Sequence, residues 1–153
     1  MTISKFAPDI DDAIALLHLV QECFAYMAPR IDPPSSMHQL TCDTIRKHAR
    51  DHDILTFGTP VVGCLFLTFF PDHVYLGKLA ISPQHRHQGH ARALIDHARD
   101  IAANRGLAWL ELQVRIELTE NHRFFEKMGF VKVAETAHAG YDRPTSFTYR
   151  RPV

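Results

Sequence analysis

The chain has 153 residues, and its 17 lysine and arginine side chains balance its 17 aspartate and glutamate side chains. This length fits one domain with a full hydrophobic core. A net charge of zero argues against a general attraction to nucleic acid or to an anionic membrane, so any anion must be bound by a local site.

The cysteines and the N-terminus indicate the compartment. Cys23, Cys42 and Cys64 are an odd set without CxxC spacing, which predicts reduced thiols and not a disulfide framework. The start MTISKFAPDID lacks a basic segment leading into an apolar one, and the longest apolar run, VVGCLFLTFF, is too short to span a bilayer. We therefore expect a soluble, cytoplasmic protein.

The first third of the chain predicts one short strand and two helices. Thr2 to Phe6 alternates like a strand, and Pro8-Asp9 then supplies a stop and a helix cap. Pro29, Pro33 and Pro34 end this helix, and Ser35-Ser36 predicts the start of a second, more polar helix that reaches about Ala49. The apolar face of the first helix has helical spacing and consists of Ile10, Ala13, Ile14, Leu17, Val20 and Phe24.

From Ile54 onward the pattern changes to strands. The segments ILTF, VVGCLFLTFF and HVYLGKLAI predict three antiparallel strands joined by tight turns. After the loop that follows Ile81, apolar spacing predicts a helix that ends at Gly106, and WLELQVR predicts the next strand. A short helix over Thr119 to Met128 and the strands FVKVAET and SFTYR complete an α+β order with one strand-loop-helix-strand unit.

The loop in that unit has the features of an anion site. A strand end, a short polar loop and a helix start near Gly89 direct unpaired amides and the positive end of a helix dipole toward one point. Gly89 has no side chain to keep phosphate oxygens from the backbone, and Ala91 keeps the next turn narrow. Arg86 adds a charge that can make a forked contact with phosphate. The loop therefore predicts a phosphate-bearing ligand.

The pattern Arg86-x-x-Gly89-x-Ala91 resembles the R/Q-x-x-G-x-G/A motif of the GNAT superfamily of N-acetyltransferases, where it holds the pyrophosphate of acetyl-CoA. LAISP and NHRFFEKMGF are also similar to family segments, so the resemblance covers about Tyr75 to Val131. It implies a single GNAT-like domain over residues 1–153, with a mixed, mostly antiparallel sheet of about six to seven strands and about four flanking helices. It also implies a splayed V between the strands around 75–81 and 109–115.

Other types of binding site at this loop would need residues that the sequence does not have. Neither the Gly-Lys-Ser/Thr ending of a nucleoside-triphosphate loop nor a dinucleotide G-x-G-x-x-G occurs. His85, His87 and His90 have no cysteine or carboxylate close by in sequence, so we expect no metal. Arg92 and Arg99 extend a basic patch, but aromatic interleaving and a positive net charge are missing, so we expect no nucleic-acid partner.

The resemblance assigns cofactor contacts to the strand and the loop. In the family, pantetheine pairs with the strand before the loop, here Leu76 to Ile81, and one amide at Leu79 or Ala80 would stabilise the oxyanion on the acetyl carbonyl. His87 and His90 would contribute backbone amides. The expected acetyl-CoA contacts are Leu79, Ala80, Ile81, Arg86, His87, Gln88, Gly89, His90, Ala91 and Asn121.

Acetyl transfer also needs a base, because an alkyl amine with a pKa of about 10.4 is protonated at neutral pH. Glu111 in WLELQVR is the first candidate, since WLE resembles a family strand whose glutamate sometimes has this role. Strand alternation puts Glu111, Gln113 and Arg115 on the face opposite Leu110 and its neighbours. The alternative for Glu111 is a solvated carboxylate paired with a lysine. Arg115 and Glu117 are either a substrate clamp or solvated charges.

The general acid is where the chain departs from the family. Phe125 occupies the position of a family tyrosine that lies near the thioester sulfur, and phenylalanine cannot donate a proton. Tyr141 is the replacement candidate and His122 the alternative, unless the thiolate leaves unaided. Asn121 either bonds the cofactor or caps the last helix. Phe124, Phe125 and Met128 are assigned to the core.

Two classes of function follow. The first is an acetyl-CoA-dependent N-acetyltransferase acting on an unidentified amine of a small molecule or peptide. The second is a non-catalytic acyl-CoA-binding module, which the substitution at Phe125 keeps open. Relatives are often dimers, so a homodimer is one state that the resemblance allows.

Overall fold

One seven-stranded sheet runs through residues 2–153, the part of the chain that this computed structural model describes, and four α-helices flank it. None of the helices in this range is both long and apolar enough to cross a membrane. In chain order the elements are β1 (Ile3–Lys5), α1 (Ala13–Phe24), α2 (Cys42–Asp51), β2 (Asp53–Phe57), β3 (Gly63–Phe69), β4 (His73–Ile81), α3 (His90–Asn104), β5 (Trp109–Arg115), α4 (Thr119–Lys127), β6 (Val131–Thr136) and β7 (Ser146–Pro152).

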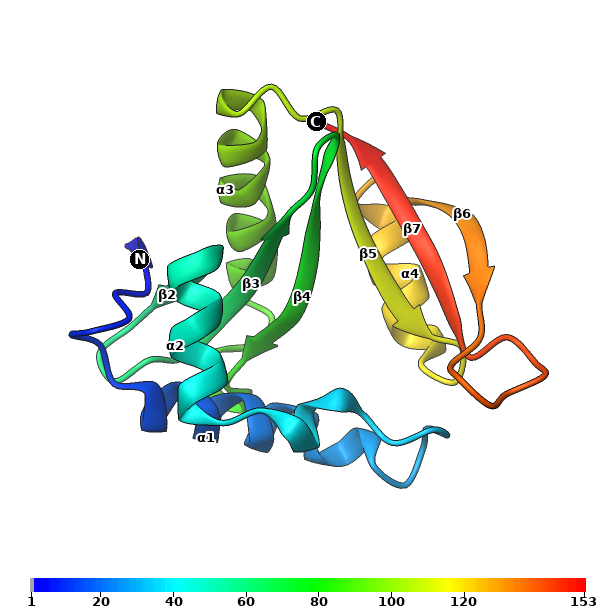
Figure 1. The fold of residues 1–153 in the computed structure, drawn as a ribbon, viewed down its shortest axis with the longest axis horizontal. Coiled ribbons are helices and arrows are strands. Elements are labelled where there is room, and N and C mark those ends of the chain that lie inside the picture. The colour runs from blue at the N-terminus through cyan, green and yellow to red at the C-terminus, as the bar shows by residue number, and fades with distance from the viewer. Residues whose placement is uncertain (1) are drawn as a thin grey trace.

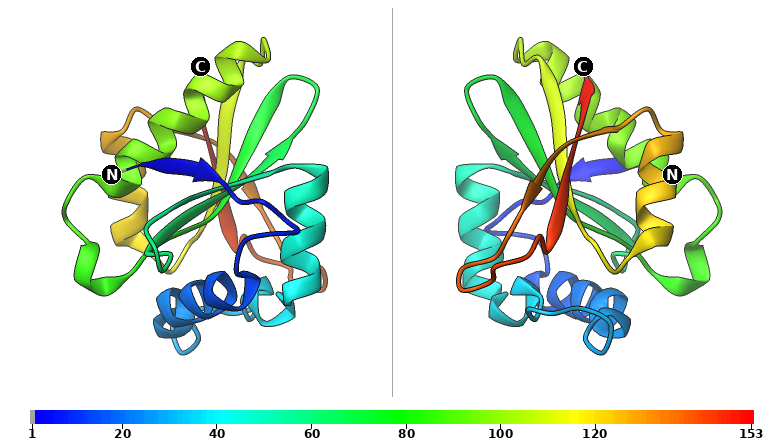
Figure 2. Two further views of the ribbon diagram at one scale, coloured as in Figure 1. Left: turned by 90° about the vertical axis from the view of Figure 1, so that its left-hand side faces the viewer. Right: turned by 90° about the vertical axis from the view of Figure 1, so that its right-hand side faces the viewer.

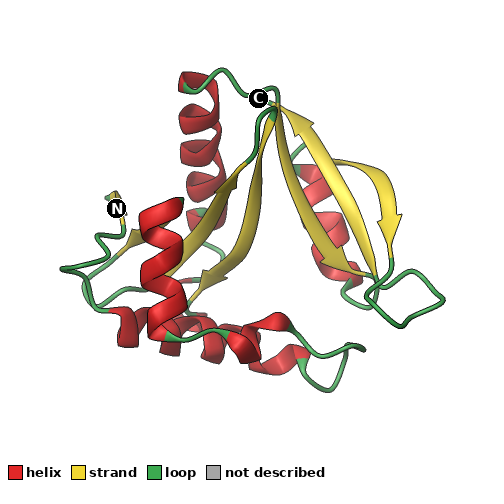
Figure 3. Cartoon of the chain, in the orientation of Figure 1, coloured by secondary structure: helices red, strands yellow, loops and turns green. Residues whose placement is uncertain are grey.

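The strand order is β1-β2-β3-β4-β5-β7-β6, and every neighbouring pair is antiparallel except β4 and β5. These two parallel strands pair only over His73 with Trp109, Val74 with Leu110 and Tyr75 with Glu111. Figures 1 and 3 show them meeting at one end and diverging toward the other, where the segment between α1 and α2 crosses the opening. The expected splayed V is therefore present.

The two faces of the sheet carry different helices. Figure 2 shows α3 and α4 on one side of the sheet and α2 on the other. On the α3 side, Leu94 and Ala98 join Val74, Leu110 and Leu112 in the larger buried cluster. The smaller cluster lies on the opposite face and combines α1, α2 and sheet residues; its members include Leu16, Val20, Ile45, Ile54, Phe66 and Ala80.

The α+β fold class, the three-stranded meander and the later strands are confirmed. Alternation along β5 is also as expected, because Leu110, Leu112 and Val114 are buried while the intervening side chains face away from that core. The 3.6-residue period of helices and the two-residue period of strands are local properties of the sequence, so both could be recognised in these segments.

The expected start of α1 was wrong by one turn. Asp12, not Asp9, caps the helix by accepting from the Ala15 amide, because the preceding residues form a turn in which Asp11 accepts from the Ala7 amide. Ile10 therefore lies outside the helix and is exposed. Ile14 lies within the helix, but its side chain is also exposed. The buried face instead contains Ala13, Leu16, Leu19, Val20 and Cys23.

The second predicted helix is two separate pieces. Ser35 caps a short 3-10 helix, Ser36–Gln39, through its hydroxyl, and the chain then extends at Leu40 before α2 begins. Thr41 and Thr44 form a reciprocal capping box at that start. Because each helix has its own cap, the short helix that begins at the serine pair ends before α2 starts.

We predict that Leu110→Ala destabilises the protein by about 2–5 kcal/mol, because Leu110 is fully buried where β4 and β5 pair and its loss leaves a cavity. Urea unfolding would measure the change. The matched variant Gln113→Ala alters an exposed side chain on the same strand and should change stability by less than about 0.5 kcal/mol. Equal losses of stability in the two variants would contradict the role assigned to Leu110 in the packing where β4 and β5 pair.

Candidate active site

The divergence of β4 from β5 coincides with a bulge in β4. Cys64 pairs with Ala80 and Phe66 pairs with Gly77, so β4 has one more residue than β3 between these two pairs. Within that bulge Lys78 has a φ of 50°, which is uncommon for a residue with a side chain. Burial lowers the pKa of Lys78. Past Tyr75, the edge of β4 that faces β5 has no strand partner.

The loop after β4 lies where the sequence predicts the cradle. His87 and Gly89 have φ values of 62° and 82°, and Gly89 is the N-cap of α3. Left-handed residues alternating with right-handed ones turn successive amides to the same side, which makes an anion-binding concavity. No heavy atom lies within 4 Å of the place where a Cβ on Gly89 would stand. The open space and the amides fit a phosphate group at the helix N-terminus.

Arg86 is anchored to the strand that precedes the cradle. Its Nε donates to the Ile81 carbonyl at 3.0 Å, and the Cys23 thiol donates to the same oxygen at 3.3 Å. Burial raises the pKa of Cys23, so this thiol stays a donor. Because the Ile81 carbonyl already accepts two bonds, its first role is to hold Arg86, whose terminal nitrogens remain for a phosphate.

Two of the loop histidines have local partners. His85 Nδ1 lies 2.8 Å from the Ser82 hydroxyl, and His90 Nε2 lies 3.1 Å from Gln88 Oε1. The His90 ring also packs 4.7 Å from the Phe57 ring. Across residues 2–153, no three side chains of the histidine, cysteine, aspartate and glutamate types gather in a way that would hold a metal ion.

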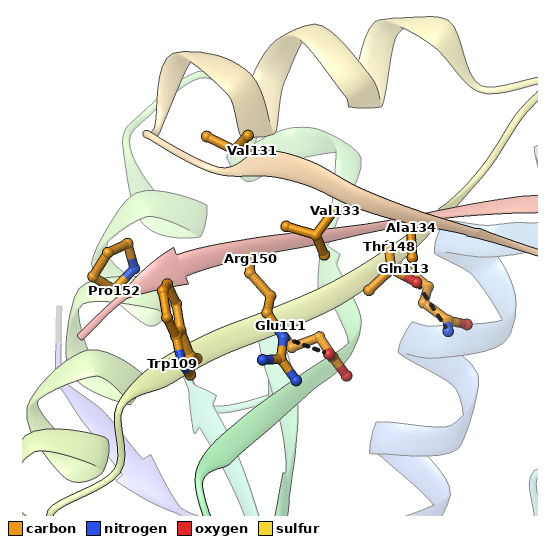
Figure 4. Close-up of a pocket in the computed structure, with 9 residues that line it drawn as sticks. All are labelled: Trp109, Glu111, Gln113, Val131, Val133, Ala134, Thr148, Arg150 and Pro152. Carbon is orange, nitrogen blue, oxygen red and sulfur yellow. Dashed lines mark hydrogen bonds and ion pairs between the residues drawn. The ribbon is translucent and has the colours of Figure 1, made fainter.

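Glu111 lies at the apex of the V, between an arginine that bonds it and a nearby histidine. Arg150 Nε donates to its Oε1 at 2.9 Å, and His73 Nε2 lies 3.4 Å from its Oε2. Figure 4 shows the pair with Arg150 in the groove that crosses β5, β7 and β6, with Trp109 and Val133 also facing it. The partner is therefore an arginine and not a lysine, and the side chain is only 17% exposed.

Tyr75 is a residue that the sequence reasoning missed. It pairs with Glu111 across the last contact of β4 with β5, and its ring lies beside Gly77, where an added Cβ would stand 3.4 Å from the ring. Burial, and then the charge of Glu111, raise the pKa of the phenol. The alternation of Tyr75 and Gly77 against the buried Val74 and Leu76 is the signal that could have found it.

A polar network around Asp32 closes the wide end of the V. The Tyr141 hydroxyl donates to Asp32 Oδ1 at 2.6 Å, and the Asp32 amide donates to Glu117 Oε2 at 3.2 Å. Arg115 donates to the carbonyls of Pro33 and Pro34 at 2.8 and 3.0 Å. Arg115 and Glu117 thus hold the segment between α1 and α2 and are not free surface charges. We call these contacts the mouth network.

The remaining candidates lie on or near α4. Asn121 is inside the helix and does not cap it, because Leu118 occupies the N-cap position without a side-chain bond. His122 Nε2 bonds the Arg115 carbonyl at 2.9 Å. Phe125 packs edge-on against Phe130 in the larger core and Met128 is buried, as expected, but the core assignment of Phe124 was wrong, because its side chain is exposed.

Tyr141 is exposed in the loop between β6 and β7, and its bond to Asp32 raises the pKa of its hydroxyl. The phenol is therefore protonated at neutral pH and can serve as a donor. Its present acceptor is a carboxylate of the mouth network.

The first comparison with known proteins concerns sequence. Residues 14–130 match the profile described as "Acetyltransferase (GNAT) family". This range includes all of α1 except its first residue, together with the cradle, β5 and α4. A search of curated proteins finds no match.

Solved structures show the same fold at low identity. The PaiA N-acetyltransferase from Thermoplasma acidophilum, in complex with coenzyme A, is 16% identical with a TM-score of 0.81, and the match covers 100% of each chain. An acetyltransferase from Streptococcus agalactiae is 18% identical with a TM-score of 0.76, over 99% of this chain and 98% of that one. The ribosomal-protein-S18-alanine N-acetyltransferase from Escherichia coli is 20% identical with a TM-score of 0.69, over 99% and 92%.

The ion pair of Arg30 with Glu120 gives a titration test of the contact between α4 and the segment after α1. Arg30 makes bonds of 2.6 and 3.0 Å to the carboxylate and lowers the pKa of Glu120 to about 2. We predict that Arg30→Gln raises this pKa toward the ordinary value of about 4.3, measured by NMR titration. Because the folded-state pKa is depressed, the pair stabilises the fold above the unfolded pKa, and that contribution is lost as the pH falls toward about 2.

The control is Arg99→Gln, which removes a comparable exposed partner of Asp100 on α3 and should leave Glu120 unchanged. A Glu120 pKa that stays near 2 in Arg30→Gln would show that Arg30 is not its cause.

Proposed function

Because the chain belongs to the GNAT acetyltransferase family, whose members use acetyl-CoA, we propose that it moves the acetyl group of acetyl-CoA to an amine by direct attack in a ternary complex. The observation that carries this proposal is the cradle at Arg86 to Ala91 beside the unpaired edge of β4. The acceptor is an amine of a small molecule or a peptide.

The pyrophosphate binds in the cradle. Amides of His87 to Ala91 point at it, Gly89 leaves the space for its oxygens, and the Arg86 guanidinium adds the opposing charge. Gln88 and His90 are tied to each other by their side chains, which fixes the loop that carries the amides. Asn121, in the first turn of α4 across the V, supplies a further polar contact.

The pantetheine arm pairs with the free edge of β4 and takes the place of a strand. Leu79 is the backbone partner beyond the bulge, and Ile81 contributes its amide while its carbonyl holds Arg86. The amide of Leu79 or Ala80 stabilises the oxyanion on the acetyl carbonyl. The left-handed conformation of Lys78 supports this role, because it re-aims the amide that follows.

Glu111 acts as the base, through water, on the acceptor ammonium. Its place at the apex of the V puts a carboxylate beside the gap that the thioester would occupy, and Arg150 fixes its orientation. The acceptor nitrogen then attacks the carbonyl carbon, and the C–S bond breaks.

Tyr141 protonates the departing thiolate. Support comes from its phenol, which stays protonated at neutral pH, and from its place in the mouth network, where the wide end of the V closes. Tyr75, whose raised pKa also keeps it protonated, is the competing donor nearer to Glu111.

The proposal also covers the domain organisation, the cellular compartment and the partners of the enzyme. Residues 1–153 form a single acetyltransferase domain that works in the cytoplasm, where Cys23, Cys42 and Cys64 stay reduced. Acetyl-CoA and the amine are its partners, and a homodimer is compatible with this activity.

We predict that acetyl-CoA raises the melting temperature by roughly 5–10 °C at about a hundred times its dissociation constant, because such saturation adds about 2.7 kcal/mol. Differential scanning fluorimetry measures the shift, with NADPH and ATP as phosphate-bearing controls. No shift, or an equal shift with all three, would reject the cofactor assignment.

Two glycine variants locate the binding site in the same assay. Gly89 and Gly106 both have left-handed φ values and open space around a new Cβ, so Gly89→Ala and Gly106→Ala carry similar backbone strain. Only Gly89→Ala should lose the shift caused by acetyl-CoA. Equal loss in both would mean that the strain, and not the cradle, governs binding.

We predict that Glu111→Gln lowers kcat by about 10²–10⁴-fold at neutral pH and flattens its rise with pH, because the base is lost. The acceptor panel contains 2-phenylethylamine, cadaverine, alanine amide and a peptide with N-terminal alanine, and release of the CoA thiol reports turnover. In the same assay Tyr141→Phe should lower kcat more than Tyr75→Phe. An unchanged pH profile in Glu111→Gln rejects the base, and binding without turnover of any amine favours the non-catalytic module.

A further inference from the structure

The groove across β5, β7 and β6 lies on the face of these strands that points away from the buried Leu110 and Leu112 (Figure 4). Trp109, Val131 and Val133 line it and are 37%, 64% and 55% exposed, although they are large apolar side chains. An apolar groove that contains a few convergent polar groups is typical of a small-ligand site. The groove therefore has the character of a binding site.

The register of the three strands arranges the groove in rows, because directly opposite residues lie on the same face of a sheet. Trp109 is opposite Pro152, which makes an apolar row at one end. Glu111 is opposite Arg150, and Arg150 is in turn opposite Val131. Glu111 and Arg150 are the charged residues of the lining. The groove thus presents one negative and one positive group side by side between apolar surfaces.

Arg150 has donors left for a ligand. Its Nε donates to Glu111 Oε1 at 2.9 Å, whereas its terminal nitrogens, Nη1 and Nη2, have no hydrogen-bond acceptor within residues 2–153. The side chain is 28% exposed, and its guanidinium carbon lies 5.9 Å from the centre of the Trp109 ring. Two free terminal nitrogens form a planar fork that matches the two oxygens of a carboxylate. The fork therefore indicates a ligand that carries a carboxylate.

We propose that the acceptor is a free α-amino acid with an apolar side chain; this rests on the proposed acetyl transfer with Glu111 as base. The carboxylate of the amino acid binds the terminal nitrogens of Arg150, and its ammonium lies beside Glu111. Its side chain packs on Trp109 and Val133. An α-amino acid carries its two charged groups on one carbon, which fits a groove whose opposite charges are in direct contact.

The products are then an N-acetyl amino acid and the CoA thiol. The α-amino nitrogen forms the amide bond while the C–S bond breaks, and of the two protons that the ammonium loses, the thiolate takes one and water the other. An amine without a carboxylate would leave the fork of Arg150 without a partner, and a site built for a polar group discriminates strongly against an analogue that lacks it. Arg150 is therefore a specificity-determining residue for the carboxylate.

The first test compares phenylalanine with 2-phenylethylamine, which differ only in the carboxylate and are both largely protonated at neutral pH. The wild type should favour phenylalanine in kcat/KM by about 10–100-fold, because bonds to a charged group are lost in the amine. Arg150→Gln should abolish most of this preference. The variant also removes the bond that orients Glu111, so it should slow both substrates, and the ratio of the two kcat/KM values isolates the carboxylate.

Two matched variants serve as controls. Arg151→Gln alters the next residue of β7, which donates to the Met128 carbonyl on the opposite face, and should keep the preference for phenylalanine. Trp109→Ala should lower kcat/KM for phenylalanine by about 10-fold relative to alanine, because the apolar contact is lost. Phe124→Ala removes a ring of similar exposure from α4, 39% against 37%, and should leave the ratio of phenylalanine to alanine unchanged.

Calorimetric titration of phenylalanine in the presence of coenzyme A separates the groove from the function beneath it. If the wild type acetylates 2-phenylethylamine or cadaverine at least as well as phenylalanine, the amino-acid assignment is overturned and acetyl transfer stands. If no amine is acetylated, the proposed function fails, and binding decides: phenylalanine bound by the wild type and not by Arg150→Gln supports this ligand class, whereas no binding overturns it. A dimer that Val131→Asp separates would assign the groove to a second copy of the chain and overturn the proposal.

Discussion

The short parallel pairing of β4 with β5 is the constraint on which the rest of the structure depends. Three residue pairs join a half-sheet of β1 to β4 to a half-sheet of β5, β7 and β6. The larger core continues across this joint, since Val74 and Leu110 meet there and helix α3 packs over both. Beyond the joint, the facing edges keep backbone groups without strand partners. Unpaired backbone groups are costly when buried, so this gap favours a ligand that can pair with them.

Strain is concentrated along the same gap. In residues 2–153, Lys78 and His87 are the only residues with side chains that adopt a positive φ, and both border the path from the apex to the cradle. Each such conformation costs on the order of 1–3 kcal/mol and persists only where the surroundings enforce it. For Lys78 the enforcing element is the ladder with β3 on both sides of the bulge, and for His87 it is the anchored Arg86 before it and the capped start of α3 after it. This strain is consistent with backbone amides that already point toward the ligand site before a ligand binds.

Several of these features could be predicted from the sequence because they depend on residues that are close together in the chain. The cradle was predicted because Arg86, Gly89 and Ala91 are close in the chain, and β5 because its alternation is a property of seven consecutive residues. The start of α1 was missed because two aspartates compete for one cap, and the choice depends on the turn closed by Asp11. The mouth network joins Asp32 to Tyr141 over 109 residues, and no pattern within one segment reports such a contact. The bulge at Lys78 likewise depends on the register with β3.

Glu111 shows how one residue can be recognised from sequence while its working environment is not. Its strand and its face follow from β5 alone, but its neighbours come from the β4 start and from β7, which are brought together only by the sheet order. Arg150 on one oxygen and His73 near the other leave the carboxylate with two distinct sides. The orientation of Glu111 therefore depends on a strand from each half-sheet, because β4 supplies His73 and β7 supplies Arg150.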